Sequence, residues 1–335
     1  MSSLPSIGGG SLDVNESYAP RVPDNVPAQR RDADANWTFT SERPLDLLTT
    51  LDRLGRGPGD PTHQVTPGGD VWRTARSAAG TATYRLRQHG RNGVDCLAWG
   101  SGAADVIARL PELVGERDEH SGFQPGLALL EEAHRRHLGL RTPRTTFVLD
   151  ALMAGVIEQR VLTIDARAAW RRLHMRFGDA APGPCPAGMR LPLSPAQWLG
   201  IPSWEWHRAG VDPGRARTAR ACAQVAGRVE EAAHLPQDGA ARRLMAIPGV
   251  GVWTAAEVAQ RALGDSDAVS VGDYHLARNI GWTLVGRPVD DDVMLELLAP
   301  WQPYRYRVVR LLDVSGSWHR PRFGPRSPRD TSYKI

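Results

Sequence analysis

Residues 244–255 of the 335-residue chain read LMAIPGVGVWTA, and this stretch predicts two short helices joined by a tight turn. Leu244 and Ile247 would end the first helix, and residues 248–251 (PGVG) would form the turn. The two glycines permit unusual backbone angles and leave no side chain where a backbone approaches another molecule. Free N–H groups at the start of the second helix would form an anion site suited to one phosphate. A plain glycine turn between packed helices is the alternative.

A carboxylate follows this turn further along the chain. Residues 271–274 read VGDY, and Asp273 stands where another helix is expected to begin. An aspartate at a helix start commonly caps the helix by accepting backbone N–H groups. The glycine turn followed by this aspartate is more specific than either half alone, so the two are interpreted together.

The paired stretches resemble the helix-hairpin-helix (HhH-GPD) superfamily of DNA glycosylases. In that resemblance residues 244–255 are the hairpin and Asp273 is the catalytic aspartate. Two further stretches, 301–305 (WQPYR) and 151–159 (ALMAGVIEQ), are similar to the bacterial 3-methyladenine DNA glycosylase II branch, the AlkA-like enzymes. The resemblance covers residues from about 40 to about 315 and is strongest from 244 onward.

The resemblance implies base excision repair of double-stranded DNA that contains a damaged base. The base, expected to be an alkylated purine, would leave the helical stack and enter a pocket. Breaking its N-glycosidic bond leaves positive charge on the sugar, which the ionised carboxylate of Asp273 would stabilise. Two alternatives stay open. One is a glycosylase for an oxidised or deaminated base, and the other is a DNA-binding protein that has lost catalysis.

The lysine and cysteine content bears on the reaction type. Lys334 is the only lysine in a chain with 41 lysine and arginine residues. Bifunctional members of the superfamily attack the sugar with a hairpin lysine, whereas the corresponding residues 251–254 here are GVWT. The sequence therefore predicts a monofunctional enzyme without AP-lyase activity. The three cysteines lie far apart, so no iron–sulfur cluster and no required cofactor are expected.

Three residues are predicted to line the base pocket. Trp253 corresponds to a pocket tryptophan of the family, with a position in the core as the alternative. Glu257 lies one turn later on the same helix face, where AlkA-like enzymes usually carry an aromatic residue. Asp313 stands where they have another base-facing tryptophan. These carboxylates would attract a cationic base or accept hydrogen bonds from a base edge; for Glu257 a solvated helix surface is the alternative.

Further residues are predicted to contact DNA or an ion. The family inserts a side chain into the gap left by the extruded base at the position of Gln159 and Arg160. Arg160 would stack there, or bind a phosphate at the surface. The hairpin would contribute Pro248, Gly249, Val250, Gly251 and Thr254. The family also tends to hold a monovalent cation on hairpin carbonyls, which map to Met245, Ile247 and Val250.

The whole sequence predicts an α+β chain in four parts. Residues 1–36 are rich in Gly, Pro, Ser, Asn and Asp and are expected to form a disordered tail. Residues 37–118 alternate in short runs between two helical stretches, which indicates a small antiparallel α/β domain. The family carries a TATA-binding-protein-like (TBP-like) domain there. Residues 119–317, helical after Arg144, would form the mainly α-helical HhH-GPD domain, and 318–335 a basic extension.

Bulk properties add weaker constraints. The net charge of +4 is a mild indication of a polyanionic partner. The sequence has no apolar run of about 18 residues and begins without an apolar signal segment, so neither a membrane nor secretion is expected. We expect a monomer in the cytoplasm, associated with the nucleoid.

Overall fold

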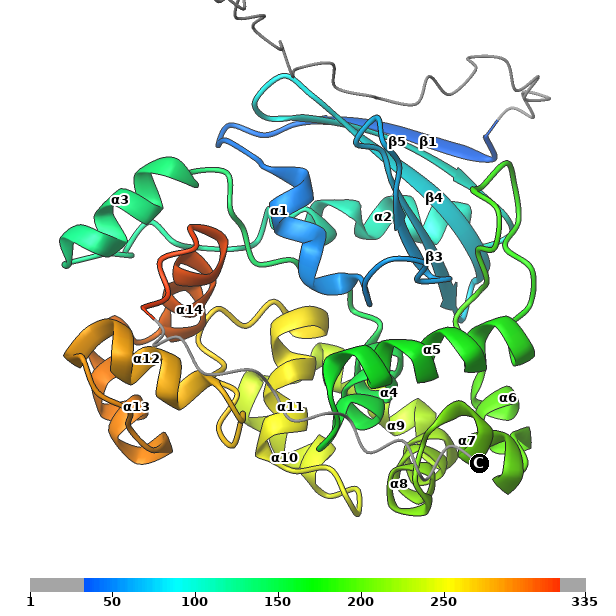
Figure 1. Cartoon of the computed structure of the whole chain (residues 1–335). Helices are drawn as coiled ribbons and strands as arrows, with labels where there is room; N and C mark the ends of the chain where they lie inside the picture. Colours follow the sequence, from blue (N-terminus) through cyan, green and yellow to red (C-terminus); the bar gives the residue numbers. More distant parts are fainter. Residues whose placement is uncertain (1–32, 320–335) are drawn as a thin grey trace, which may run out of the picture.

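The computed structural model describes residues 33–319 and shows an α+β protein (Figure 1). An antiparallel sheet lies on one side of the molecule and helices fill the other. The expected tail falls mainly on residues 1–32 and the expected C-terminal extension mainly on 320–335, which lie outside the described residues. In the described part, no helix combines the length and apolar character needed to cross a membrane.

The N-terminal domain is a five-stranded antiparallel sheet with the strand order β1-β5-β4-β3-β2. The alternation of apolar and polar residues puts Tyr84, Leu86 and Val94 on one face of the sheet, where helices α1 and α2 cover them. The elements are β1 (Ala35–Thr40), α1 (Leu47–Leu51), η1 (Asp52–Leu54), β2 (His63–Val65), β3 (Val71–Ser77), β4 (Gly80–His89), β5 (Gly93–Trp99) and α2 (Ala103–Leu113).

The structure confirms the expected antiparallel sheet and adds an edge strand that the sequence did not indicate. Strand β1 begins at Ala35, inside the segment expected to be disordered, and pairs Trp37 with Cys96 of β5. Asp34, just before it, accepts a hydrogen bond from the N–H of Gly100 at 2.7 Å. The boundary at residue 36 was therefore wrong, because pairing with a strand far along the chain orders these residues.

The helical domain has two hydrophobic cores. One is built on α4 and the helices up to α11, and the other on α3 with α12, α13 and α14. Helix α3 was not expected from the sequence; only Leu130 and Ala133 of it are buried, and it packs on α14 from the far end of the domain. The helices are α3 (Ala128–Arg136), α4 (Val148–Glu158), α5 (Thr163–Phe177), α6 (Pro195–Gly200), α7 (Ser203–Ala209), α8 (Pro213–Gln224), α9 (Ala226–Glu230), η2 (Glu231–His234), α10 (Gln237–Met245), α11 (Val252–Val258), the π-helical turn η3 (Ala259–Leu263), α12 (Leu276–Val285), α13 (Asp291–Leu298), η4 (Ala299–Trp301) and α14 (Arg305–Val314).

A loop of the helical domain covers the second face of the sheet. Trp72 and Trp99 stack there with ring centroids 5.5 Å apart, and Met189 of the loop between α5 and α6 packs against them. The hydroxyl of Thr74 on β3 donates to the carbonyl of Arg190 at 2.7 Å. The two domains are thereby joined on this side.

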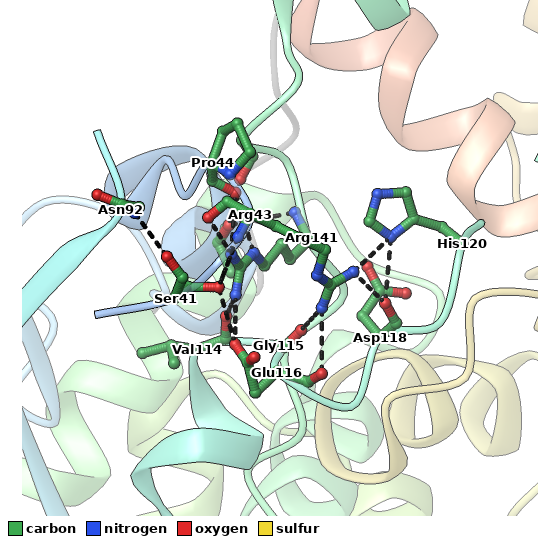
Figure 2. A network of polar contacts seen from close by, with 12 residues as sticks. Ser41, Arg43, Pro44, Asn92, Val114, Gly115, Glu116, Asp118, His120 and Arg141 are labelled. Atoms are coloured by element: carbon green, nitrogen blue, oxygen red, sulfur yellow. Dashed lines mark hydrogen bonds and ion pairs between the residues drawn. The ribbon is translucent and has the colours of Figure 1, made fainter. Parts of the chain in front are cut away.

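A network of buried arginines joins the domains at the other end of the sheet (Figure 2). Arg141 is buried and donates to the carbonyl of Pro44 (3.0 Å) and to Oε2 of Glu116 (2.9 Å). Arg307 of α14 forms a buried ion pair with Asp118, which also accepts the N–H of Thr142. These contacts set the position of the N-terminal domain relative to α14.

Candidate active site

The hairpin lies between α10 and α11, in the middle of the helical domain (Figure 1). Gly249 has a φ of +90°, and a Cβ there would lie 2.1 Å from Oγ1 of Thr218 on α8. A side chain is excluded by both the backbone angle and this contact. A Cβ on Gly251 would meet no atom within 4 Å, so that glycine leaves open space. Val250, between them, is buried in the core as the sequence predicted.

The start of α11 has free backbone donors. The first N–H to bond back to a carbonyl is that of Ala255, which donates to Gly251 at 3.0 Å. The N–H groups of residues 252–254 therefore precede the hydrogen-bonded part of the helix. Pro248, Gly249, Gly251 and Val252 are exposed beside them. This geometry suits a close-approaching phosphate.

Asp273 lies at the start of α12 and is partly exposed. Its Oδ1 accepts the N–H groups of His275 (2.8 Å) and Leu276 (2.9 Å), as expected of a capping aspartate. Among the described residues, no donor bonds to Oδ2. The neighbouring Tyr274 is 78% exposed, so the loop opens to the outside of the molecule. One oxygen thus fixes the carboxylate, and the other is free to face a ligand.

Hydrogen bonds connect the Asp273 loop to the helix that follows the hairpin. The N–H of Asp273 donates to the carbonyl of Ser270 at 3.2 Å, and the Ser270 hydroxyl donates to Oε1 of Glu257 at 2.6 Å. Gln260 of η3 donates through Nε2 to Oγ of Ser270 at 2.9 Å. Glu257 also forms a buried ion pair with Arg261. The hairpin helix therefore sets the position of the loop that carries Asp273.

The structure places Glu257 inside the protein, so the alternative of a solvated helix surface is wrong. Its burial raises the pKa of the carboxyl, but Arg261, Arg53 and the Ser270 hydrogen bond outweigh this, and the pKa is lowered overall. The carboxylate is therefore ionised and already paired on both oxygens. A direct contact from Glu257 to a base stays a prediction, and its observed contacts are those of a supporting residue.

The other two predicted pocket residues lie at the surface. Trp253, in the first turn of α11, is half-buried and is not a residue of the core. Asp313, near the end of α14, has a 42% exposed side chain that accepts from Arg310 (3.2 Å) and Trp318 (3.2 Å). Their contact with a base stays a prediction.

The loop after α4 is held against the hairpin. Nε2 of Gln159 donates to the carbonyl of Gly249 (3.0 Å) and to Oγ1 of Thr254 (2.9 Å). Arg160 is exposed and has a φ of +53°, a left-handed conformation that is strained for arginine. Thr254 is only 2% exposed, so its side chain faces Gln159 and α4. If Thr254 contacts DNA as predicted, the contact must therefore come from its backbone N–H and not from its side chain.

The carbonyls predicted for a monovalent cation lie on this hairpin. The oxygen of Ile247 accepts the N–H of Val250 at 3.0 Å, which closes the turn and leaves one lone pair. Met245 and Val250 flank it in the sequence, and a cation held by these three carbonyl oxygens stays a prediction. In the described part of the chain, no cluster of three His, Cys, Asp or Glu side chains is arranged for a metal.

The structure also reveals a cleft that sequence reasoning missed. It lies between η1 of the N-terminal domain, η3 and α14, and its free volume is about 10 Å³, room for roughly one water molecule. Its lining includes Thr50, Arg53, Gln260, Arg261, Tyr306 and Arg310. Arg53 and Gln260 are far apart in the sequence, so no local pattern could have joined them.

The chain resembles known DNA repair proteins in part of its sequence and in its fold. No family model matches the sequence. Over 176 residues, 50% of this chain, the sequence is 31% identical to the "Probable bifunctional transcriptional activator/DNA repair enzyme AlkA" of two Mycobacterium tuberculosis strains. The match covers 33% of those proteins, so the chain spans about a third of the length of the relatives it matches.

Solved structures share the fold over most of the chain. The 3-methyladenine DNA-glycosylase from Archaeoglobus fulgidus has a TM-score of 0.70 at 15% identity, covering 82% of this chain and 96% of that one. The Clostridium acetobutylicum 8-oxoguanine glycosylase/lyase in complex with double-stranded DNA has a TM-score of 0.64 at 11% identity, covering 82% and 96%. The chain is thus similar over half its length to AlkA proteins in sequence, and it shares its fold with these solved DNA glycosylases.

Proposed function

We propose that this protein is a monofunctional DNA glycosylase that removes an alkylated base from double-stranded DNA. The observation that carries the proposal is the hydrogen bonding of the Asp273 carboxylate. Its Oδ1 is held by two backbone N–H groups, and Oδ2 has no donor among the described residues. The loop is anchored to the hairpin helix through Ser270 and Glu257. A phosphate bound at the hairpin would therefore stand in a fixed relation to a carboxylate.

Such a carboxylate suits glycosidic bond cleavage. As the C1′–N bond breaks, its electron pair leaves with the base and positive charge develops on the sugar. Oδ2 of Asp273 stabilises that charge electrostatically. A water molecule then adds to C1′, and its proton passes through Asp273 to solvent. The products are the free base and an abasic site.

The DNA contacts follow from the exposed groups around Asp273. The free N–H groups of residues 252–254 bind one phosphate of the backbone, which carries no sequence information. Arg160 projects from the neighbouring loop and fills the gap left by the extruded base. The hairpin carbonyls of Met245, Ile247 and Val250 would hold a monovalent cation close to that phosphate, lending it positive charge.

The proposal also covers the form of the substrate, the oligomeric state, the location in the cell and the absence of strand cleavage, as the sequence predicts them. The substrate is double-stranded DNA with a damaged base, and the protein acts on it as a monomer in the cytoplasm, at the nucleoid. Strand cleavage by β-elimination is not expected, because the hairpin residues 251–254 include no lysine.

A lesion panel tests the proposal. The full-length protein is incubated with duplexes that each carry one modified base, and abasic sites are then revealed as strand breaks by alkali. The proposal predicts breaks only after alkali, and with alkylated bases. Failure to release any base from the whole panel would contradict it and would favour a DNA-binding protein without catalysis.

A further inference from the structure

The loop between α4 and α5 contains a strained residue whose side chain is unengaged. Arg160 has a φ of +53°, which is uncommon for any residue other than glycine. Its side chain is exposed and, among the described residues, has no hydrogen-bond or ion-pair partner. Such a conformation persists only where the surrounding structure enforces it. The contacts that enforce it are found on the residues that precede Arg160.

The three preceding residues are each held by a different part of the molecule. Helix α8 holds Ile157, whose carbonyl accepts from Nη1 of Arg215 at 2.6 Å. The hairpin holds Gln159, which donates to one of its carbonyls at 3.0 Å. Between these two, Glu158 pairs with Arg56 of the N-terminal domain, whose Nη1 is 3.2 Å from Oε1. The N-terminal domain therefore reaches the end of α4, directly before the strained residue.

Arg56 belongs to a loop that also contacts α5. This loop, residues 55–61 between η1 and β2, is called the bracing loop below. The carboxylate of Asp60 accepts the backbone N–H of Arg56 at 2.7 Å and the indole N–H of Trp170 on α5 at 3.2 Å. The bracing loop thus contacts both helices that flank Arg160, α4 through an ion pair and α5 through a hydrogen bond.

The ion pair between Arg56 and Glu158 is suited to fixing a position. The two side chains are 9% and 20% exposed, so both ions lose much of their hydration. The cost of this desolvation offsets much of their attraction, and an intact pair of this kind contributes little net stability. Its effect is geometric, because the two confined charges hold the bracing loop and the end of α4 in one arrangement.

We propose that Arg56 is a positioning residue for the extrusion of the damaged base. It holds Glu158, and with it the strained backbone that presents the Arg160 guanidinium to the gap in the base stack. Because the loop is ordered before DNA binds, binding does not have to order it. Arg56 is 8% exposed and acts through Glu158 without touching the DNA. This inference rests on the proposed glycosylase function and gives the N-terminal domain a part in extrusion.

Two duplexes that each carry one 7-methylguanine provide the test. In the first the lesion is paired with cytosine. In the second it faces a tetrahydrofuran abasic-site analogue, so no base pair has to be broken and extrusion costs less. A 2-aminopurine beside the lesion reports unstacking by its fluorescence, and alkali reveals excision. We expect Arg56→Gln in the full-length protein to slow unstacking and single-turnover excision of the paired lesion about tenfold, and of the unpaired lesion less than about twofold.

Three further variants keep the test decisive. Glu158→Gln removes the other partner of the ion pair and should reproduce this pattern, also if Arg56→Gln does not fold. In an Arg160→Gln background, Arg56→Gln should slow the paired lesion no further, because both changes act through the same guanidinium. Arg76→Gln removes another arginine that pairs across the two domains, with Asp179 at 2.6 Å, and should leave both duplexes at parental rates.

The outcomes separate the two proposals. Equal slowing of both duplexes by the variants of the ion pair, or no slowing, would overturn the positioning role, and the proposed function would stand. Parental rates for Arg160→Gln, or additive slowing in the double variant, would overturn it as well. If the parent unstacks the duplex without releasing 7-methylguanine, the fluorescence rates decide the inference and the lesion panel decides the function. A parent that neither unstacks a duplex nor releases any base contradicts both.

Discussion

The Ser270 hydroxyl donates to Oε1 of Glu257 at 2.6 Å, and this contact joins the loop that carries Asp273 to the helix that follows the hairpin. The second oxygen of Glu257 is taken by Arg261. A single carboxylate thus connects two predicted parts of the active site, phosphate contact and catalysis. Its charge acts on the position of Asp273, in addition to any effect on the base.

Replacing Glu257 should therefore affect stability and all substrates together. Glu257→Gln leaves Arg261 buried without its counter-ion, and we expect the free energy of unfolding to fall by about 3 kcal/mol. Excision of every lesion should slow by a similar factor, because the Asp273 loop loses an anchor. Urea denaturation and single-turnover kinetics measure the two effects. Glu296→Gln, an exposed residue of α13, is the matched control. Unchanged stability, or slower excision of cationic bases alone, would contradict the supporting role.

The same ion pair predicts a pH dependence of stability. Folding lowers the pKa of Glu257, so its contribution is complete above the ordinary pKa of a glutamate. The contribution is lost as the pH falls through the lowered value of the folded state. The difference in unfolding free energy between the parent and Glu257→Gln should therefore shrink in acid. Denaturation curves at a series of pH values measure it, and a difference that grows in acid would be inconsistent with this sign.

Asp273→Asn separates binding from chemistry. Asparagine keeps an Oδ1 that can accept the N–H groups of His275 and Leu276, so the start of α12 and the melting temperature should be preserved. The charge is lost, and excision should fall by at least about a hundredfold. Gel-shift titration should show lesion DNA bound as tightly as by the parent. An Asn variant with near-parental excision would rule out the assigned role.

The two hairpin glycines should respond differently to alanine. Gly249→Ala forces a left-handed residue against Thr218, so we expect a loss of stability of about 2 kcal/mol or more together with weaker DNA binding. Gly251→Ala meets open space and should leave stability unchanged. It should still weaken binding of all duplexes about equally, because a methyl group stands where the phosphate approaches. Altered lesion preference with unchanged affinity would refute the hairpin assignment.

Borohydride trapping tests the absence of a lyase step. A covalent intermediate needs an amine nucleophile, and Lys334 is the only lysine, in a part of the chain outside the described residues. We expect no protein–DNA adduct on gels after reduction. If an adduct forms, Lys334→Ala identifies its source: an adduct that persists in this variant would implicate the N-terminal amine and contradict the monofunctional assignment.

The sequence by itself was sufficient for the hairpin, the capping aspartate and most of the sheet. These features are local. Gly249 has a left-handed backbone angle that favours glycine, and Val250 is a buried apolar residue beside it. The strands show their alternation of apolar and polar residues within a few positions. Strand β1 and helix α3 were missed because each is ordered by partners far along the chain, β5 and α14 respectively.

The arrangement of the predicted base pocket was decided by the tertiary structure alone. Glu257 could be placed on a helix face from its spacing, but its pairing with Arg261 and Ser270 depends on how η3 and the following loop fold back. Arg53 reaches the cleft because Arg261 donates to its carbonyl and Arg310 pairs with Asp52 beside it. Contacts across such separations leave no periodic signal, since a sequence pattern records only which faces of one element are apolar.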